Sequence, residues 1–296
     1  MPPISRRRAL GIFGAVGAGV AGLGASIRSL GNPAPRPKVA AGTERSIEAY
    51  GPLARQSGEW WVPPGVSSRL LPTVVLIHGG YWRDGFGPDL EDAVAADLAA
   101  RGFLVWNVDY RPSSAPWPST LADTALAFDH TSIGTYAARV DRDRLAVVGH
   151  SAGGCLALWL ASRGRVPAGG PGAGTTLPPP TLAVGQAPVA GLAEGALLNL
   201  GGGAVQALLG GSPTDRADRY AAADPMALLP SGVRSVLLHS EADRLVPLSQ
   251  SEGYAAAASS AGDDCRLVRV PGNHFAHLDP TSGAVAALHE ALGTLT

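Results

Sequence analysis

The sequence contains only one lysine and two cysteines among its 296 residues. Lys38 lies in a proline-rich stretch that resembles a linker. Schiff-base chemistry, Ser–Lys dyads and phosphate-binding P-loops all need a lysine held at a defined position, so these chemistries are excluded. Cys155 and Cys265 form no C-x-x-C pair, and we expect two free thiols packed among apolar side chains rather than a disulfide.

Charge is scarce as well. Charged residues make up 16% of the chain and hydrophobic residues 46%, a balance opposite to that of disordered proteins. The formal net charge is −1, and no basic run follows the first eight residues, which argues against nucleic acid as a partner. The length is sufficient to bury the core of one large α/β domain.

The N-terminus has the pattern of an export signal. Ser5-Arg6-Arg7-Arg8 precedes an uncharged stretch rich in glycine and alanine that runs to Ile27. The paired arginines resemble a twin-arginine signal, so we expect the export machinery of that route as a partner and a periplasmic or extracellular location. The alternative is a retained membrane anchor, although so many glycines make a poor one. We therefore divide the chain into a signal and linker (1–41) and a catalytic domain (42–296).

Short apolar runs alternate with stretches rich in alanine and leucine after residue 42. This alternation predicts βαβ crossovers, and hence an α/β fold with a mostly parallel sheet covered by helices on both faces. Residues 164–180, rich in Gly and Pro, are expected to form a surface loop. Residues 188–211 are apolar and are expected to form either core helix or a small cap. The expected strands are 59–62, 73–77, 104–108, 145–148, 181–184, 235–239 and 267–270, and the expected helices include 89–100, 121–138, 154–162 and 253–261.

A candidate nucleophile follows the expected strand at 145–148. The run Gly149-His150-Ser151-Ala152-Gly153 matches G-x-S-x-G and leads into an expected helix. Between a strand and a helix this pattern is typical of a nucleophile elbow, which exposes the serine hydroxyl on a strained turn at the helix N-terminus. Ser151 is therefore the expected nucleophile.

A serine nucleophile needs a base and an acid that orients the base. Asp243 leads an Asp-x-x-Val-Pro turn after the strand at 235–239 and is preferred over Glu241 as the acid. His274 follows the last strand, beside a Gly-Asn turn, and is the expected base. His277, three residues later, is expected to pack or to begin the final helix. His239 is assigned only to the end of a buried strand.

The strand at 73–77 ends in His78-Gly79-Gly80-Tyr81-Trp82, a glycine turn able to present backbone N–H groups to an oxyanion. The expected donors are the N–H groups of Gly80, Tyr81 and Ala152. His78 is expected to hold the loop, and His150 to shape the pocket. Trp82 and Trp117 are expected to help line a modest apolar substrate pocket. We expect no metal and no organic cofactor, since the H-x-x-H-x-D run at 274–279 lacks further ligands nearby.

Taken together, these motifs resemble the α/β-hydrolase superfamily, and within it the carboxylesterase group related to hormone-sensitive lipase and kynurenine formamidase. The resemblance implies an α/β-hydrolase fold with a small cap or none, and a triad of Ser151, Asp243 and His274. Asp109, Arg111 and Asp123 are interpreted as a structural polar cluster. The matching segments, which span most of residues 45–290, are His78 to Trp82, Asp109-Tyr110-Arg111, Gly149 to Gly154, Asp243 to Pro247, and His274-Phe275 followed by Asp279-Pro280.

The sequence thus favours a serine hydrolase that cleaves small to medium carboxylic esters through an acyl-enzyme on Ser151. An aryl formamidase using the same triad is the close alternative, because the H-G-G-x-W form resembles the formamidase branch. An inactive hydrolase-fold binding protein is the alternative from another class. The expected partner is a small-molecule ester or amide.

Overall fold

The computed structural model describes residues 37, 39–66 and 70–295. The expected export signal lies outside these residues, apart from the last few positions of the linker. Within the described part of the chain, no helix combines the length and apolar composition needed to cross a bilayer.

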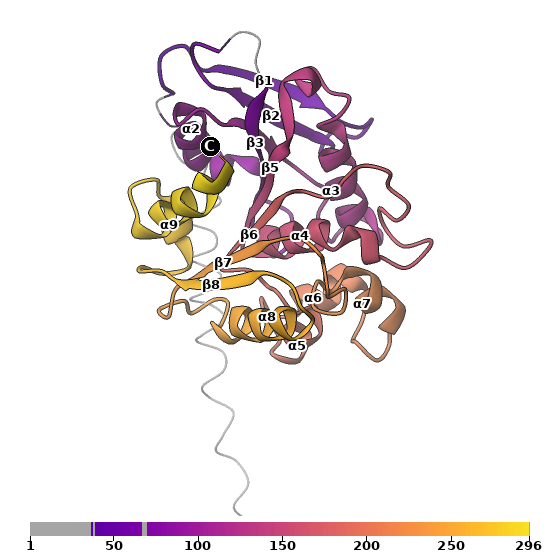
Figure 1. Ribbon diagram of the computed structural model, residues 1–296. Coiled ribbons are helices and arrows are strands. Elements are labelled where there is room, and N and C mark those ends of the chain that lie inside the picture. The colour runs from indigo at the N-terminus through magenta and orange to yellow at the C-terminus, as the bar shows by residue number, and fades with distance from the viewer. Residues whose placement is uncertain (1–36, 38, 67–69, 296) are drawn as a thin grey trace, which may run out of the picture. The chain divides into compact units, whose positions relative to one another are not determined.

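An eight-stranded sheet forms the centre of the described chain (Figure 1). Its strand order is β1-β2-β4-β3-β5-β6-β7-β8, and all neighbours from β4 to β8 pair in parallel. β1 and β2 add an antiparallel edge. The strands are β1 (Glu44–Ala49), β2 (Ser57–Val62), β3 (Leu71–Ile77), β4 (Leu104–Val108), β5 (Val140–His150), β6 (Leu182–Gln186), β7 (Ser235–His239) and β8 (Cys265–Arg269).

The sheet is buried on both faces, and its central strands β3, β4, β6 and β7 are mostly apolar and buried at every position. In β3, Val75 and Ile77 belong to one hydrophobic core, whereas Val74 and Leu76 belong to another on the opposite face. This division follows from the alternation of side chains along a strand. The near-continuous apolar runs thus allow helices to pack on both faces of the sheet.

The helices divide between the two faces (Figure 1). α2 (Asp92–Ala100) and α9 (Gly283–Leu292) pack on one face, and α3 (Ser119–His130), α4 (Ala152–Ala161) and α8 (Ser249–Ser260) pack on the other. The expected mostly parallel sheet with helices on both faces is confirmed. The expected helix over 121–138 is wrong in its second half: α3 ends at His130, and turns around Gly134 lead to a 3₁₀ turn at Ala137–Arg139.

Three short helices join β6 to β7: α5 (Leu192–Leu197), α6 (Ala204–Leu209) and α7 (Ala217–Ala223). The first two account for the apolar stretch at 188–211. This insertion contacts the loop that follows β3. A Cβ on Gly201 would come within 2.8 Å of the ring of Tyr81 in that loop. Residues 166–181 form the expected irregular loop, with several exposed positions.

Candidate active site

The strand-to-helix turn at Ser151 has the geometry of a nucleophile elbow. Ser151 adopts φ 56° and ψ −116° between β5 and α4, in a region that L-residues rarely occupy. Ser151 is the N-cap residue of α4, at the helix end where unpaired N–H groups and the helix dipole favour negative charge. Ser151 itself is only 3% exposed.

The glycines of the motif are required by close backbone contacts. A Cβ on Gly153 would overlap the carbonyl oxygens of Ile77 and His78 at the end of β3. A Cβ on Gly149 would overlap the carbonyl of Gly153 across the turn. The elbow is therefore pressed against the neighbouring strand, and only glycine allows that approach.

An acid and an imidazole meet where β7 and β8 end. His274 begins the 3₁₀ helix η4 (His274–Leu278), and its Nδ1 lies 2.6 Å from Oδ2 of Asp243. Both side chains are almost completely buried. Burial alone would raise the pKa of Asp243, but hydrogen bonds from His239 and His274 outweigh it and hold that pKa well below its ordinary value.

Asp243 is ionised in this arrangement and accepts from four directions. Its Oδ1 accepts the backbone N–H groups of Leu245 and Val246 at 2.8 and 3.0 Å. Its Oδ2 accepts from His274 and faces the Nε2 of His239 at 3.4 Å. A carboxylate oriented in this way fixes the Nδ1–H tautomer of its imidazole partner and leaves Nε2 free to take a proton.

His150 joins the elbow to the loop that carries His274. Its Nε2 donates to the backbone oxygen of His274 at 2.9 Å, and the two rings are 4.7 Å apart. Burial, followed by the neighbouring His274 and His277, holds the pKa of His150 well below its ordinary value, so the ring is neutral. Among the described residues, the hydroxyl of Ser151 and His274 form no hydrogen bond. A contact between a nucleophile and its base often tightens only when substrate is bound.

The glycine loop after β3 is held in an unusual backbone conformation. Gly80, Tyr81 and Trp82 have φ values of 109°, 53° and 55° in succession. The hydroxyl of Tyr81 donates to the carbonyl of Leu245 at 2.8 Å, which ties this loop to the turn that carries Asp243. Burial, followed by the charge of Asp243, raises the pKa of Tyr81 to about 12.

The three expected oxyanion donors lie on segments that adjoin Ser151. Ala152 is the first residue of α4, and Gly79, which precedes Gly80, lies so close to the elbow that a Cβ there would be 3.1 Å from the Cβ of Ser151. The structure therefore brings the glycine loop and the elbow together. Contacts of this kind are needed for N–H groups of both segments to act on one oxygen.

The two tryptophans expected to line a substrate pocket lie in different surroundings. Trp82 is 1% exposed and packs in the core. Trp117 is partly buried, and the guanidinium of Arg219 lies over its ring at 5.5 Å. Glu241 is exposed and lies 3.4 Å from Arg269, which agrees with the choice of Asp243 as the acid.

His78 holds its loop, as expected. Its Nε2 lies 3.3 Å from Asp109, its Nδ1 contacts the carbonyl of Gly79 at 2.7 Å, and its ring stacks on Tyr110. Arg55 binds both oxygens of Asp109.

Of the expected polar cluster of Asp109, Arg111 and Asp123, Arg111 pairs with Asp123, whereas Asp109 pairs with Arg55 and His78. Arg111 forms two hydrogen bonds of 2.7 Å to the carboxylate of Asp123, and Gln56 donates a third. Cys155 and Cys265 are both free thiols, the first buried and the second partly buried. Neither cysteine forms a cross-link.

His277 is buried, and neither ring nitrogen has a partner among the described residues. Burial, followed by repulsion from His274 and His239, lowers its pKa to about 3. Within the described chain, no group of three or more His, Cys, Asp or Glu side chains is placed to hold a metal ion.

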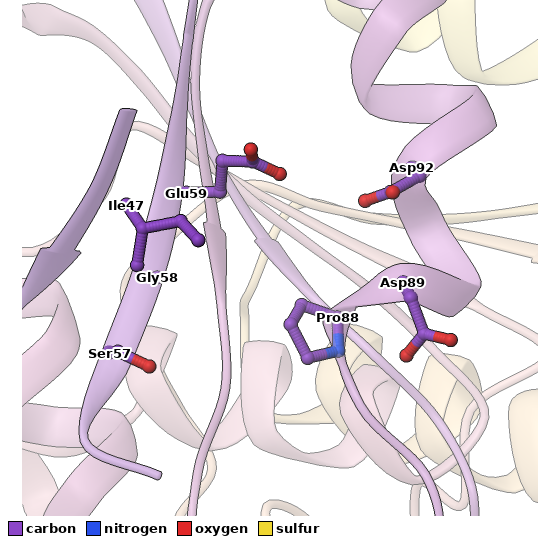
Figure 2. A pocket seen from close by; sticks show the side chains of 7 residues that line it. All are labelled: Ile47, Ser57, Gly58, Glu59, Pro88, Asp89 and Asp92. Carbon is purple, nitrogen blue, oxygen red and sulfur yellow. The ribbon is translucent and has the colours of Figure 1, made fainter. Parts of the chain in front are cut away.

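A pocket of about 130 Å³ opens elsewhere, between the β1–β2 edge and the segment before α2 (Figure 2). Two of its acidic residues already face Arg45, which pairs with Glu59 at 2.6 Å and lies 3.7 Å from Asp92. Its lining contains no residue of the expected triad or oxyanion loop and consists of Ile47, Ser57, Gly58, Glu59, Pro88, Asp89 and Asp92.

The contacts that two histidines make with Asp243 and His274 were not predicted from the sequence. His239 was assigned only to the end of a strand, yet it faces the acid. His150 was expected to shape the pocket, yet its ring binds the backbone of His274. The contact of His150 joins segments 124 residues apart. That of His239 lies within one turn, four residues from Asp243, but depends on how that turn folds back on the end of β7.

Comparison with known proteins places these features in a known fold. Residues 61–167, which include the glycine loop and the elbow, match the BD-FAE family. The chain is 39% identical to carboxylesterase NlhH of Mycobacterium tuberculosis over 116 residues, covering 38% of this chain and 34% of that protein. It is 31% identical to esterase LipC of the same organism over 110 residues, covering 36% of this chain and 27% of that protein. The matches thus span about a third of these relatives.

Structural similarity extends over nearly the whole chain. Esterase B of Lactobacillus rhamnosus HN001 superposes with a TM-score of 0.76 at 19% identity, covering 94% of this chain and 92% of that one. The eight-stranded, mostly parallel sheet and this superposition agree. The chain has the α/β-hydrolase fold, and the expected resemblance to carboxylesterases of that superfamily is confirmed.

Proposed function

We propose that this protein is a serine hydrolase that cleaves carboxylic esters of small to medium size through an acyl-enzyme on Ser151. The observation that carries the proposal is the buried 2.6 Å contact between His274 Nδ1 and Asp243, linked through His150 to a strained serine elbow. The similarity to a carboxylesterase and to an esterase supports the choice of ester substrates.

The proposed reaction has two steps. His274 Nε2 takes the proton of Ser151 as Oγ attacks the ester carbonyl carbon, and Asp243 stabilises the imidazolium that forms. The oxyanion of the tetrahedral intermediate is bound by backbone N–H groups of Gly80, Tyr81 and Ala152. When the carbon–oxygen bond to the leaving alcohol breaks, His274 returns the proton to that oxygen, leaving an acyl ester on Ser151.

In the second step, water replaces the alcohol. His274 removes a proton from the water as its oxygen attacks the acyl carbon, and then returns that proton to Ser151 as the acid leaves. No step draws on a metal or an organic cofactor. The chemistry is thus completed by the triad, the N–H donors and water.

The decisive experiment is labelling with a fluorophosphonate probe, combined with turnover of a short-chain aryl ester. Wild type should be labelled and active, whereas Ser151→Ala should be neither. Ser113→Ala, which changes a serine outside the proposed triad, serves as the matched control and should behave as wild type. Equal labelling of wild type and Ser151→Ala would refute Ser151 as the nucleophile, and a wild type that is neither labelled nor active would favour a binding protein.

A second candidate reaction is hydrolysis of an aryl formamide by the same triad. It is favoured by the H-G-G-Tyr-Trp form of the glycine loop, whose Gly80, Tyr81 and Trp82 share positive φ values. The comparison is between the kcat/KM values for an aryl acetate and for N-formylkynurenine. Negligible turnover of the ester, together with turnover of the formamide, would replace the first proposal by the second.

We also propose that the protein is exported in folded form by the twin-arginine route. The proposal is supported by Ser5-Arg6-Arg7-Arg8 and the uncharged stretch after it. Replacing Arg6 and Arg7 by lysine should leave the protein inside the cell, as measured by fractionation of the producing strain. Unchanged export would contradict this route.

A further inference from the structure

His239, the last residue of β7, lies completely buried behind the acid. Its Nε2 is 3.0 Å from the carbonyl oxygen of Val246 and 3.4 Å from Oδ2 of Asp243. Its Nδ1 is 2.7 Å from the hydroxyl of Ser251, on α8. Because a carbonyl only accepts, Nε2 carries the proton, and in the neutral ring Nδ1 accepts from Ser251.

These contacts close the turn that carries the acid. Asp243 Oδ1 binds the N–H groups of Leu245 and Val246, so the carboxylate is fixed relative to that turn. The carbonyl of Val246 is in turn fixed by His239. With Oδ1 occupied by the backbone, only Oδ2 remains to meet His274, and its direction depends on the position of the turn.

We propose that His239 is a positioning residue of the triad, which holds the 243–246 turn closed and directs Asp243 Oδ2 toward the Nδ1–H of His274. Ser251 contributes by selecting the tautomer in which His239 Nε2 donates. The proposal rests on the proposed ester hydrolysis, in which Asp243 must keep that orientation through both proton transfers. His239 does not contact the substrate and is not a catalytic residue.

The titratable groups around His239 and Asp243 come from several elements. η4 contributes His274 and His277, the elbow contributes His150, and the glycine loop contributes Tyr81. The carboxylate of Asp243 is the acidic group that these side chains face. Removing the N–H of His239 should therefore leave the charge of Asp243 less screened by hydrogen bonds where it faces His274.

The test compares His239→Leu with His239→Gln. Leucine removes the donor, so kcat for an aryl acetate should fall by about tenfold to a hundredfold, as expected for a misplaced catalytic group. KM should stay within about twofold, since ground-state binding is not affected. The acidic limb of the kcat/KM profile should move upward by about half a pH unit, because the carboxylate that His274 faces loses one hydrogen-bond donor and so interacts more strongly with the imidazolium. Glutamine keeps an N–H donor and should retain kcat within about threefold.

Two further variants complete the set. Ser251→Ala frees the tautomer of His239 and should give a smaller loss of kcat with the same direction of pH shift. His289→Leu changes a histidine of α9 that pairs with Asp97 of α2 at 2.6 Å, away from the triad. This variant should change neither kcat nor the acidic limb.

The positioning role is overturned if His239→Leu keeps wild-type kcat and pH profile. It is also overturned if the leucine and glutamine variants lose kcat equally with an unshifted limb, which is the result expected of packing alone. If His239→Leu does not fold, His239→Gln and Ser251→Ala decide: the proposal then requires the serine variant to show the pH shift and the glutamine variant to lack it.

Failure of the ester reaction itself is recognised separately. The low-field proton NMR signal of the His274 Nδ1–H reports its bond to Asp243 without substrate. A wild type that lacks esterase turnover but shows this signal, with the signal moved or lost in His239→Leu, would refute the reaction and retain the positioning role. An unchanged signal in His239→Leu would refute the positioning role.

Discussion

The His78–Asp109 and His274–Asp243 pairs differ in what else touches the carboxylate. His78 and Asp109 lie 3.3 Å apart, and Arg55 binds both carboxylate oxygens. His274 and Asp243 lie 2.6 Å apart, and among the described ion pairs of Asp243 both partners are histidines. An arginine neutralises its carboxylate permanently, whereas a neutral histidine leaves the charge available.

This difference separates a structural pair from one suited to catalysis. The charge of Asp109 is neutralised by the guanidinium of Arg55. Its histidine, His78, therefore serves to hold the loop and to stack on Tyr110. Asp243 keeps a charge that can stabilise an imidazolium when His274 accepts a proton. Glu91 completes the comparison: it is buried, and neither carboxylate oxygen has a hydrogen-bond partner among the described residues. Burial, followed by the charge of Asp92, raises its pKa to about 8.

The largest effect is expected from Asp243→Asn. The amide cannot stabilise the imidazolium and favours the wrong tautomer of His274, so kcat for an aryl ester should fall by about 10⁴-fold. Steady-state kinetics measure this loss. The matched variant Asp109→Asn should retain activity within about tenfold. Equal losses in both variants would mean that the two pairs do not differ in role.

Asp109→Asn should act on stability more than on turnover. Asp109→Asn leaves the largely buried Arg55 without its counter-ion, and the free energy of unfolding at pH 7 should fall by about 2 kcal/mol. Burial would raise the pKa of Asp109, but His78 and Arg55 lower it. Its contribution is therefore present above the unfolded value of 3.8 and is lost as pH falls through the lower folded value. Urea unfolding of variant and wild type should converge in acid, and a constant difference would contradict this.

Glu91→Gln tests a buried carboxylate that, among the described residues, is paired with neither an arginine nor a histidine. A folded pKa of about 8 against an unfolded value of 4.5 means that the folded state binds more protons between these values. Wild-type stability should therefore decrease with rising pH in that window, by at most about 1.4 kcal/mol per unit. The glutamine variant lacks this slope. Urea unfolding at pH 5 and pH 8 measures it, and parallel pH dependence of the two proteins would refute the raised pKa.

The smallest effects come from one tyrosine hydroxyl beside each pair. Tyr81 donates to the carbonyl of Leu245 at 2.8 Å, and Tyr110 donates to the carbonyl of His78 at 2.9 Å. Phenylalanine at either position should lower the free energy of unfolding by about 1 kcal/mol. Only Tyr81→Phe should also lower kcat, by a few-fold, because it loosens the acid turn. A loss of kcat in Tyr110→Phe alone would reverse this assignment.

Much of this arrangement follows from local sequence. The apolar runs at 104–108 and 235–239 coincide with β4 and β7, because strands buried on both faces carry an unmistakable pattern. The elbow is recognisable because a strand, two glycines and a helix follow one another without interruption. Asp243 and His274 follow strands whose ends must share one edge of a parallel sheet. The sequence thus predicts their meeting, though not its distance.

Other features depend on distant partners. β1 was not expected, because its charged residues Glu44, Arg45 and Glu48 obscure the strand pattern, and pairing with β2 fixes it. The C-terminal end of α3 was overextended, since propensity alone does not end a helix at His130. The role of His239 needs the fold of the turn after β7, which no periodicity encodes. Long-range contacts thus decide what local patterns leave open.

The contact of Gly153 with the carbonyls that end β3 has a consequence for refolding. The nucleophile takes its place only after β5 is seated beside β3, and the acid and base arrive with the last two strands. Catalytic competence is thus a property of the completed sheet. By contrast, the stacked Trp60 and Trp106 need only β2 and β4 to pair. Fluorescence from these tryptophans can recover while turnover is still absent, and activity is therefore the stricter measure of the native state.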